Sequence, residues 1–124
     1  MNAIDFLLNN DAAISNIKKD VKINRLSDFA GSDIVFKIRA ISYDEYVKIL
    51  REDDNANVKL KVCSMGVLDP NLNNKSLQAK YNAADAEDLI DKMLLMGEIS
   101  MLYDEICDIS GFNDESAKTV TIKN

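Results

Sequence analysis

Apolar residues recur at helical spacing in two consecutive segments near the end of the chain. The first segment carries Ala86, Leu89, Ile90, Met93 and Leu94, and the second carries Ile99, Leu102, Tyr103, Ile106 and Cys107. Residues 95–98 interrupt the pattern between them, and Gly111 followed by Phe112 is typical of a helix end. This pattern predicts a pair of amphipathic helices, joined by a short turn and each buried along one face.

Between residues 21 and 40 the pattern changes from helical spacing to strict alternation. The alternating apolar positions are Val21, Ile23, Ile34, Phe36, Ile38 and Ala40. Since successive side chains of a strand point to opposite faces, each strand would bury one face. Residues 27–33 are rich in turn formers and are predicted to be a connecting loop. The pattern indicates an antiparallel β-hairpin, which helices must cover because two strands alone are marginal in water.

The segments on either side of the hairpin are predicted to be helical. Residues 1–17 form one helix or two short ones, because Asn9 and Asn10 interrupt the helical spacing of their apolar residues. Those residues are Ile4, Leu7, Leu8, Ile14 and Ile17. Ser42 and Glu45 form a capping box, in which each side chain binds a free backbone amide at a helix start. The apolar positions of that helix are Tyr43, Tyr46, Val47 and Leu50.

The middle of the chain is harder to assign. Residues 57–67 fit either a strand or a helix, and we favour a helix. Asp69–Pro70 indicates the start of another helix, with aspartate as the N-cap and proline at the first helical position. Leu77 and Tyr81 mark a short helix. The whole pattern predicts a mainly helical α+β single domain with one antiparallel β-hairpin and a C-terminal helix pair. We expect it to span residues 1–112 and residues 113–124 to form a flexible tail.

The chain lacks the residue types on which most catalytic sites depend. It has no histidine, two separated cysteines (Cys63 and Cys107) and four isolated glycines. Histidine is the commonest general base and metal ligand, two distant thiols are too few for a cysteine metal site, and isolated glycines form no phosphate-binding loop. We therefore predict a non-enzyme with no cofactor and no metal site. Both cysteines are expected to behave as small buried apolar residues.

Charge argues against two classes of partner. The chain carries 15 basic and 21 acidic residues, a net charge of −6, which repels phosphate backbones and anionic lipids. A basic cluster formed by Lys18, Lys19, Lys22 and Arg25 is interpreted as a solvated edge. There is no apolar run of the roughly 20 residues that cross a bilayer, and residues 1–10 lack the basic start of a secretion signal. We expect no nucleic-acid partner, no membrane partner and no export.

Several short motifs follow one another in a recognisable order. They are Phe6-Leu7-Leu8, Val21-Lys22-Ile23-Asn24-Arg25-Leu26, Asp44-Glu45-Tyr46, Pro70-Asn71-Leu72 and Leu77-Gln78-Ala79-Lys80-Tyr81. The most diagnostic stretch, residues 88–98, reads DLIDKMLLMGE, and residues 106–112 close the series. In this order the chain resembles the XkdN-like tail assembly chaperones of phages and prophages over roughly residues 4–112. Met96 departs from the family where proline is common, and Leu26 where an aromatic residue often follows the arginine.

The resemblance implies a protein that is made with the tail genes, acts in the host bacterial cytoplasm and is absent from the mature particle. Such a chaperone is expected to bind the tape measure protein, keep its long hydrophobic helices soluble and recruit tail tube subunits. The resemblance also favours the helix at residues 57–67 and leaves self-association open. Two rival functions are a minor structural component of a phage tail or tail-like particle, and a small regulatory adaptor or antitoxin.

Two groups of residues are candidates for the partner-binding surface. Leu95, Met96 and Met101 fall outside the apolar stripes of the helix pair and flank its turn. Flexible methionines suit a surface that accepts irregular hydrophobic partners; packing against the N-terminal helix or the hairpin is the alternative interpretation. If these three residues are core, the candidate surface becomes the edge of the hairpin. Its basic residues are Lys22, Arg25, Lys37 and Arg39.

Overall fold

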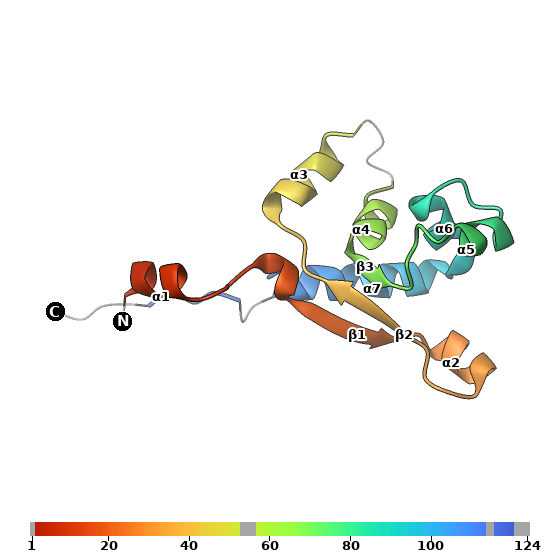
Figure 1. Ribbon diagram of the computed structural model, residues 1–124, viewed down its shortest axis with the longest axis horizontal. Coiled ribbons are helices and arrows are strands. Elements are labelled where there is room, and N and C mark those ends of the chain that lie inside the picture. Colours follow the sequence, from red (N-terminus) through yellow and green to blue (C-terminus); the bar gives the residue numbers. More distant parts are fainter. Residues whose placement is uncertain (1, 53–56, 114–115, 121–124) are drawn as a thin grey trace.

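An antiparallel sheet packs against helix α7 (Met96–Ile109) in the computed structural model, which describes residues 2–52, 57–113 and 116–120 (Figure 1). Within these residues the sheet has three strands, in the order β1 (Lys18–Lys22), β2 (Val35–Arg39) and β3 (Val67–Asp69). Phe36 and Ile38 of the central strand are buried. The predicted α+β class and hairpin are confirmed. Strand β3 was not predicted, because three residues directly after a helix are too few to show alternation.

The connection between β1 and β2 differs from the predicted loop, since it contains helix α2 (Asn24–Ala30). The turn former Ser27 is buried, and its hydroxyl donates to the Ile23 carbonyl (2.9 Å) while accepting from the amide of Ile34 (2.8 Å). Gly31 ends the helix with a left-handed backbone, φ 72°. Ser27 therefore links the helix to the residue before β2 through hydrogen bonds, and Gly31 ends the helix. The turn propensity of serine and glycine does not reveal either role.

Helix α3 (Tyr43–Leu50) begins with the predicted capping box, which is confirmed by hydrogen bonds in both directions. Its predicted apolar face was wrong in part. Tyr43 and Leu50 are exposed, whereas Ile49 is buried in the core. The helix lies on one side of the body and contacts mainly α4, so the narrow face around Ile49 is the part that packs (Figure 1).

Helix α4 (Val58–Gly66) confirms the helical interpretation of residues 57–67 and packs against both α6 and α7. Its Val62 and Cys63 are completely buried. At Gly66, helices α4 and α7 approach so closely that an added Cβ atom would lie 2.7 Å from Ile106 Cδ1. Glycine is therefore required by close packing at this point of the core.

The predicted helix start at Asp69–Pro70 was wrong. This peptide bond is cis, and the chain is still extended there because Asp69 pairs with Lys37 of the sheet. Helix α5 (Lys75–Lys80) begins later, where the Asn74 side chain accepts a hydrogen bond from the amide of Leu77 (2.9 Å). Asparagine is as good an N-cap as aspartate, so sequence alone did not distinguish the two sites.

The C-terminal helix pair is confirmed as helices α6 (Ala86–Met93) and α7. Leu89, Ile90, Leu102 and Ile106 have no exposed surface and form the centre of the core. The break between the helices is shorter than predicted, because α7 already begins at Met96 and Gly97 lies in its first turn. After α7, the amides of Gly111 and Phe112 donate to the carbonyls of residues 108 and 107, which is the Schellman motif.

The two ends of the described chain project from this body (Figure 1). The N-terminal arm, defined here as residues 2–17, contains helix α1 (Ala3–Asn9) and the short 3₁₀ helix η1 (Ile14–Asn16), which confirms two short helices. No residue of either helix is buried, so the apolar face predicted for this segment does not contribute to the core. Residues 116–120 are exposed; the remainder of the tail predicted at 113–124 lies largely outside the described residues.

Candidate partner-binding surface

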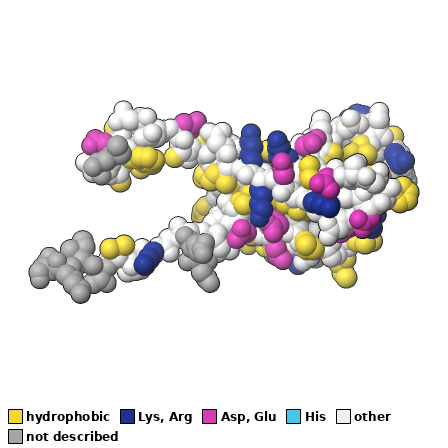
Figure 2. Space-filling view, turned by 90° about the horizontal axis from the view of Figure 1, so that it is seen from below, with side chains coloured by type: hydrophobic (Ala, Val, Ile, Leu, Met, Phe, Trp, Pro, Cys, Tyr) yellow, Lys and Arg dark blue, Asp and Glu magenta, His cyan; other side chains and the backbone are white. Residues whose placement is uncertain are grey.

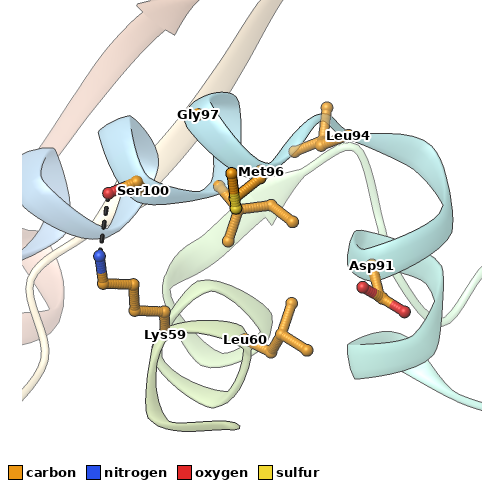
Figure 3. Close-up of a pocket in the computed structure, with 8 residues that line it drawn as sticks. Lys59, Leu60, Asp91, Leu94, Met96, Gly97 and Ser100 are labelled. Atoms are coloured by element: carbon orange, nitrogen blue, oxygen red, sulfur yellow. Dashed lines mark hydrogen bonds between the residues drawn. The ribbon is translucent and has the colours of Figure 1, made fainter. Parts of the chain in front are cut away.

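A groove of about 690 Å³ lies between α4, the end of α6 and the start of α7 (Figure 3). Its lining is mainly apolar. The lining residues are Lys59, Leu60, Asp91, Leu94, Met96, Gly97, Ile99 and Ser100. Figure 3 shows Leu60 pointing from α4 toward α6, and Met96 reaching from the first turn of α7 into the space beside α4. The groove therefore brings together two segments that are far apart in sequence.

The α6–α7 turn explains why two large apolar residues stand in solvent. The backbone becomes extended at Leu94 and Leu95. Leu94 points into the core, while Leu95 is 57% exposed and Met96 is 88% exposed. The sequence pattern placed both residues outside the buried stripes of the helix pair, and their exposure agrees with that placement.

Arg25 and Glu98 hold this turn in position. The Arg25 guanidinium donates to the Glu98 carboxylate through Nε (3.0 Å) and Nη2 (2.9 Å), and Nη2 also donates to the carbonyl of Met93 (3.1 Å). The same carboxylate accepts from the amide of Leu95 (2.7 Å). The Arg25 guanidinium lowers the pKa of the Glu98 carboxyl. Because this pairing is bidentate, it fixes orientation as well as charge. These hydrogen bonds therefore tie the apolar turn to α2.

Polar groups border the apolar part of the groove. Lys59 Nζ donates to Ser100 Oγ (3.0 Å), and the same ammonium lies 5.5 Å from the centre of the Tyr103 ring. Figure 3 shows Lys59 and Asp91 on opposite sides of the groove. An apolar floor with a few charged groups at its rim is a common arrangement at sites that bind a helix or a small apolar ligand.

Met101 does not belong to this groove. It is 64% exposed and borders a separate small hollow of about 100 Å³, together with Val21, Ile23 and Arg25. The reason is helical geometry, since five residues on a helix turn a side chain by about 140°. The three apolar residues grouped by sequence therefore separate: Met96 lines the groove, Leu95 is exposed on the turn beside it, and Met101 borders the other hollow.

The basic candidates also divide. Arg25 lies on α2 and supports the α6–α7 turn, so its placement at the hairpin edge was wrong. Lys22, Lys37 and Arg39 lie on the sheet face opposite Phe36 and Ile38. That face is mixed in charge: Lys22 pairs with Asp33 (3.2 Å), and Arg39 with Glu45 (2.7 Å). Arg39 lowers the pKa of the Glu45 carboxyl to about 2.

The cysteines show no sign of reactivity in this structure. Cys63 is fully buried, and this burial raises the pKa of its thiol to about 12. Cys107 is half-buried, and desolvation raises its pKa as well. In the described part of the chain, no group of three or more histidine, cysteine, aspartate or glutamate side chains could hold a metal ion. No helix within those residues is long and apolar enough to span a bilayer.

A family model for phage XkdN-like tail assembly chaperone proteins matches residues 4–122, almost the whole chain. The chain belongs to the phage XkdN-like tail assembly chaperone family. A solved structure described as the crystal structure of the protein yqbn has the same fold, with a TM-score of 0.66 and 17% sequence identity. The comparison covers 91% of this chain and 98% of that one. Curated proteins gave no match to this chain.

In this tail assembly chaperone, the stretch that carried most of the resemblance folds into the wall of the groove. Residues 88–98 comprise most of α6, the turn and the start of α7. Sequence reasoning missed the opposite wall, formed by Lys59 and Leu60 of α4. The signal was weak, because Leu60 fitted the buried face of a helix as well as the wall of a groove. Membership of a chaperone family also points to a non-enzymatic role.

Proposed function

We propose that this tail assembly chaperone binds the tape measure protein in the host bacterial cytoplasm, helps to recruit tail tube subunits, and leaves before the particle is complete. The observation that supports this proposal most strongly is the α6–α7 turn. It holds Leu95 and Met96 in solvent beside an apolar groove, and the Arg25–Glu98 pair ties it to α2. Exposed apolar side chains that lie beside an apolar groove are typical of a protein-binding surface.

The chemistry of the groove favours an amphipathic helix as its ligand. A helix that docks in a groove inserts apolar side chains spaced at i, i+3, i+4 and i+7. Leu60, Leu94 and Ile99 offer an apolar floor to such a row. Met96 is unbranched and adaptable, so it can pack against many different sequences. A long helical protein would present many similar segments, and one groove of this kind could bind several of them.

The net charge of −6 suits the solubilising part of the role. Several copies bound along a hydrophobic helix would give the complex a large negative charge, and like-charged complexes resist aggregation. Once tail tube subunits cover the tape measure protein, the apolar contacts of the chaperone are replaced. The chaperone would then be released.

Deleting the gene tests this role. We expect the deletion to abolish tails while heads stay intact and filled with DNA, as judged by electron microscopy. Normal tails in the deletion strain would contradict the chaperone role. Mass spectrometry of purified wild-type tails is the companion measurement, and the chain should be missing from them. A fixed number of copies in each finished tail would instead favour a minor structural component.

A further inference from the structure

The groove continues into a second hollow along helix α6. This hollow has a volume of about 440 Å³ and lies beside the N-terminal part of the helix. Leu60 and Asp91 line both the groove and the hollow. Figure 3 shows Leu60 on α4 and Asp91 on α6, on either side of the space between the two helices. The groove and the hollow therefore form one continuous depression along α6, which we call the α6 trough.

The hollow is acidic where the groove is apolar. Its lining includes four carboxylates, those of Asp85, Glu87, Asp88 and Asp91. Asp88 is paired with Lys92 (3.0 Å), and Glu87 has an interaction partner as well. The positive end of the α6 dipole offsets about half of one further charge. Since Asp85 and Asp91 are both exposed, the hollow stays negative after all of these are counted.

The other end of the α6 trough carries the opposite charge. Lys59 is the only basic side chain among the described residues that line the groove and the hollow. It donates to Ser100 Oγ and lies across the groove from Asp91 (Figure 3). Figure 2 views the body from the side of β1, β2 and α2, where basic and acidic side chains are interspersed. In the α6 trough the charges are instead separated, with an apolar floor between them.

We propose that the α6 trough binds an amphipathic helix whose apolar row is followed, at one end, by lysine or arginine residues. The apolar row would lie over Leu60, Leu94 and Ile99, and the basic end over Asp85 and Asp91. Helix α6 has 8 residues and is therefore about 12 Å long, so the α6 trough suits a helix of about three turns. This inference rests on the proposed function, because it uses the same groove, and it adds which segments of a partner are selected.

Charge supplies a selectivity that the apolar floor lacks. Met96 adapts to many side chains, so the groove alone distinguishes poorly between one apolar helix and another. A helix with an acidic end would place like charges against Asp85 and Asp91, and such repulsion rejects a wrong partner. Attraction of a basic end also speeds encounter and weakens as salt screens the charges. The chain would thus select the basic-ended segments of a long helical partner.

Synthetic helical peptides that differ only in one charged turn test this selection. Each peptide has about 16 residues, enough to form a helix, and the same row of leucines, with a terminal turn of either lysines or glutamates. The charged turn comes last in one pair of peptides and first in a second pair, so both chain directions are sampled. Fluorescence anisotropy with the full chain at low salt should show the lysine peptide of one pair binding at least about tenfold more tightly than its glutamate partner. The ratio should fall toward one as salt is added.

Two protein variants with the same net charge assign the preference to the hollow. Asp85→Asn/Asp91→Asn should lose most of the preference for lysine, and it keeps the N-cap of α6 because asparagine caps as well as aspartate. Asp20→Asn/Asp44→Asn is the matched control, since it removes the same amount of charge at exposed positions on β1 and at the start of α3. The control should keep the wild-type ratio. Both variants should melt close to the wild type, because all four side chains are exposed.

Four results would overturn the proposal. They are a lysine peptide that binds no better than its glutamate partner in either direction, and a chain that binds none of the peptides. The third is an Asp85→Asn/Asp91→Asn variant that keeps the full preference. The fourth is a control variant that loses the preference equally, because the effect would then come from overall charge.

The outcomes also separate this inference from the proposed function. A chain that captures the tape measure protein but shows no preference between the peptides would refute only the selection by charge. A chain that prefers the lysine peptide but never captures the tape measure protein would refute only the proposed function. Where both are correct, Asp85→Asn/Asp91→Asn should capture the tape measure protein more weakly than the matched control does.

Discussion

The C-terminal helix pair and the N-terminal arm show the same sequence pattern with opposite outcomes. Both have apolar residues at helical spacing. Leu89, Ile90 and Leu102 are completely buried, whereas Ile4 and Leu8 are 69% and 78% exposed. The helices also differ in length: α7 has 14 residues and α1 has seven. The comparison teaches that apolar periodicity identifies a face that must be covered, but not which surface covers it. The core covers one of these faces, and the body leaves the other exposed.

The largest effect should come from truncating the same residue type in both regions. Leu102→Ala removes a fully buried side chain and should lower the free energy of unfolding by about 2–5 kcal/mol. Leu8→Ala, in the exposed arm, should change it by no more than about 0.5 kcal/mol when the chain is kept dilute. Urea unfolding followed by circular dichroism measures both. Equal losses would mean that the arm packs on its own body.

The next test concerns how closely α4 and α7 pack at Gly66. Gly66→Ala places a Cβ atom 2.7 Å from Ile106 Cδ1, and Ile106 is fully buried. Overpacking of this kind typically destabilises by about 1–3 kcal/mol. Gly97→Ala is the control, since its added Cβ would meet no atom within 4 Å beyond its chain neighbours and the backbone of its own helix turn, and the position is helical. It should be neutral or stabilise by up to about 1 kcal/mol. A thermal melt that ranks the two variants in the opposite order would contradict the close approach of α4 and α7.

Acid should weaken the body without involving the arm. Arg39 holds the pKa of the Glu45 carboxyl at about 2, below its unfolded value near 4.5. A carboxyl whose pKa is lowered by folding stabilises the native state above the unfolded pKa, and this contribution is lost as pH falls from about 4.5 to 2. Because the pair is partly exposed, we expect a loss of about 1–2 kcal/mol.

Glu45→Gln should remove that part of the pH dependence, so its unfolding free energy should approach the wild-type value as the pH falls to about 2. Asp5→Asn, in the arm, is the control and should follow the wild-type profile. Parallel profiles for wild type and Glu45→Gln between pH 5 and 2 would show that the Arg39 pair does not contribute.

The smallest predicted change in stability lies at the α6–α7 turn. Leu95 occupies the N-cap position of α7, and Glu98 already accepts from its amide. Leu95→Ser would complete a capping box and should raise stability by about 0.5–1 kcal/mol. The same change removes an exposed apolar side chain next to the groove, so capture of the tape measure protein should weaken. A variant that is more stable and binds equally well would place the binding surface elsewhere.

Local patterns predicted most of the elements, and the exceptions have physical causes. The capping box at Ser42 and the Schellman ending at Gly111 were readable because each depends on neighbouring residues. Helix α2 was missed because Ser27 and Gly31 serve helices as well as turns. The helix start placed at Asp69–Pro70 failed because Asp69 pairs with the sheet, a contact distant in sequence.

The candidate site was predictable on one side only. Leu95 and Met96 could be recognised by their position outside a regular stripe, a local property. The wall around Lys59 and Leu60 depends on how α4 packs across α7, which no local pattern specifies. Arg25 was misplaced for the same reason, since its partner Glu98 lies 73 residues further along the chain. The exposure of the arm likewise depends on the direction from which the chain enters β1.

Co-purification of the tape measure protein with wild-type chaperone and with Met96→Asp tests the central claim most directly. Met96 is 88% exposed at the first position of α7, where an aspartate favours the helix, so the variant should fold normally. We predict that the wild type captures the tape measure protein and that Met96→Asp, with an unchanged melt, loses it. Equal capture by the two proteins would contradict the assignment of the groove as the binding site.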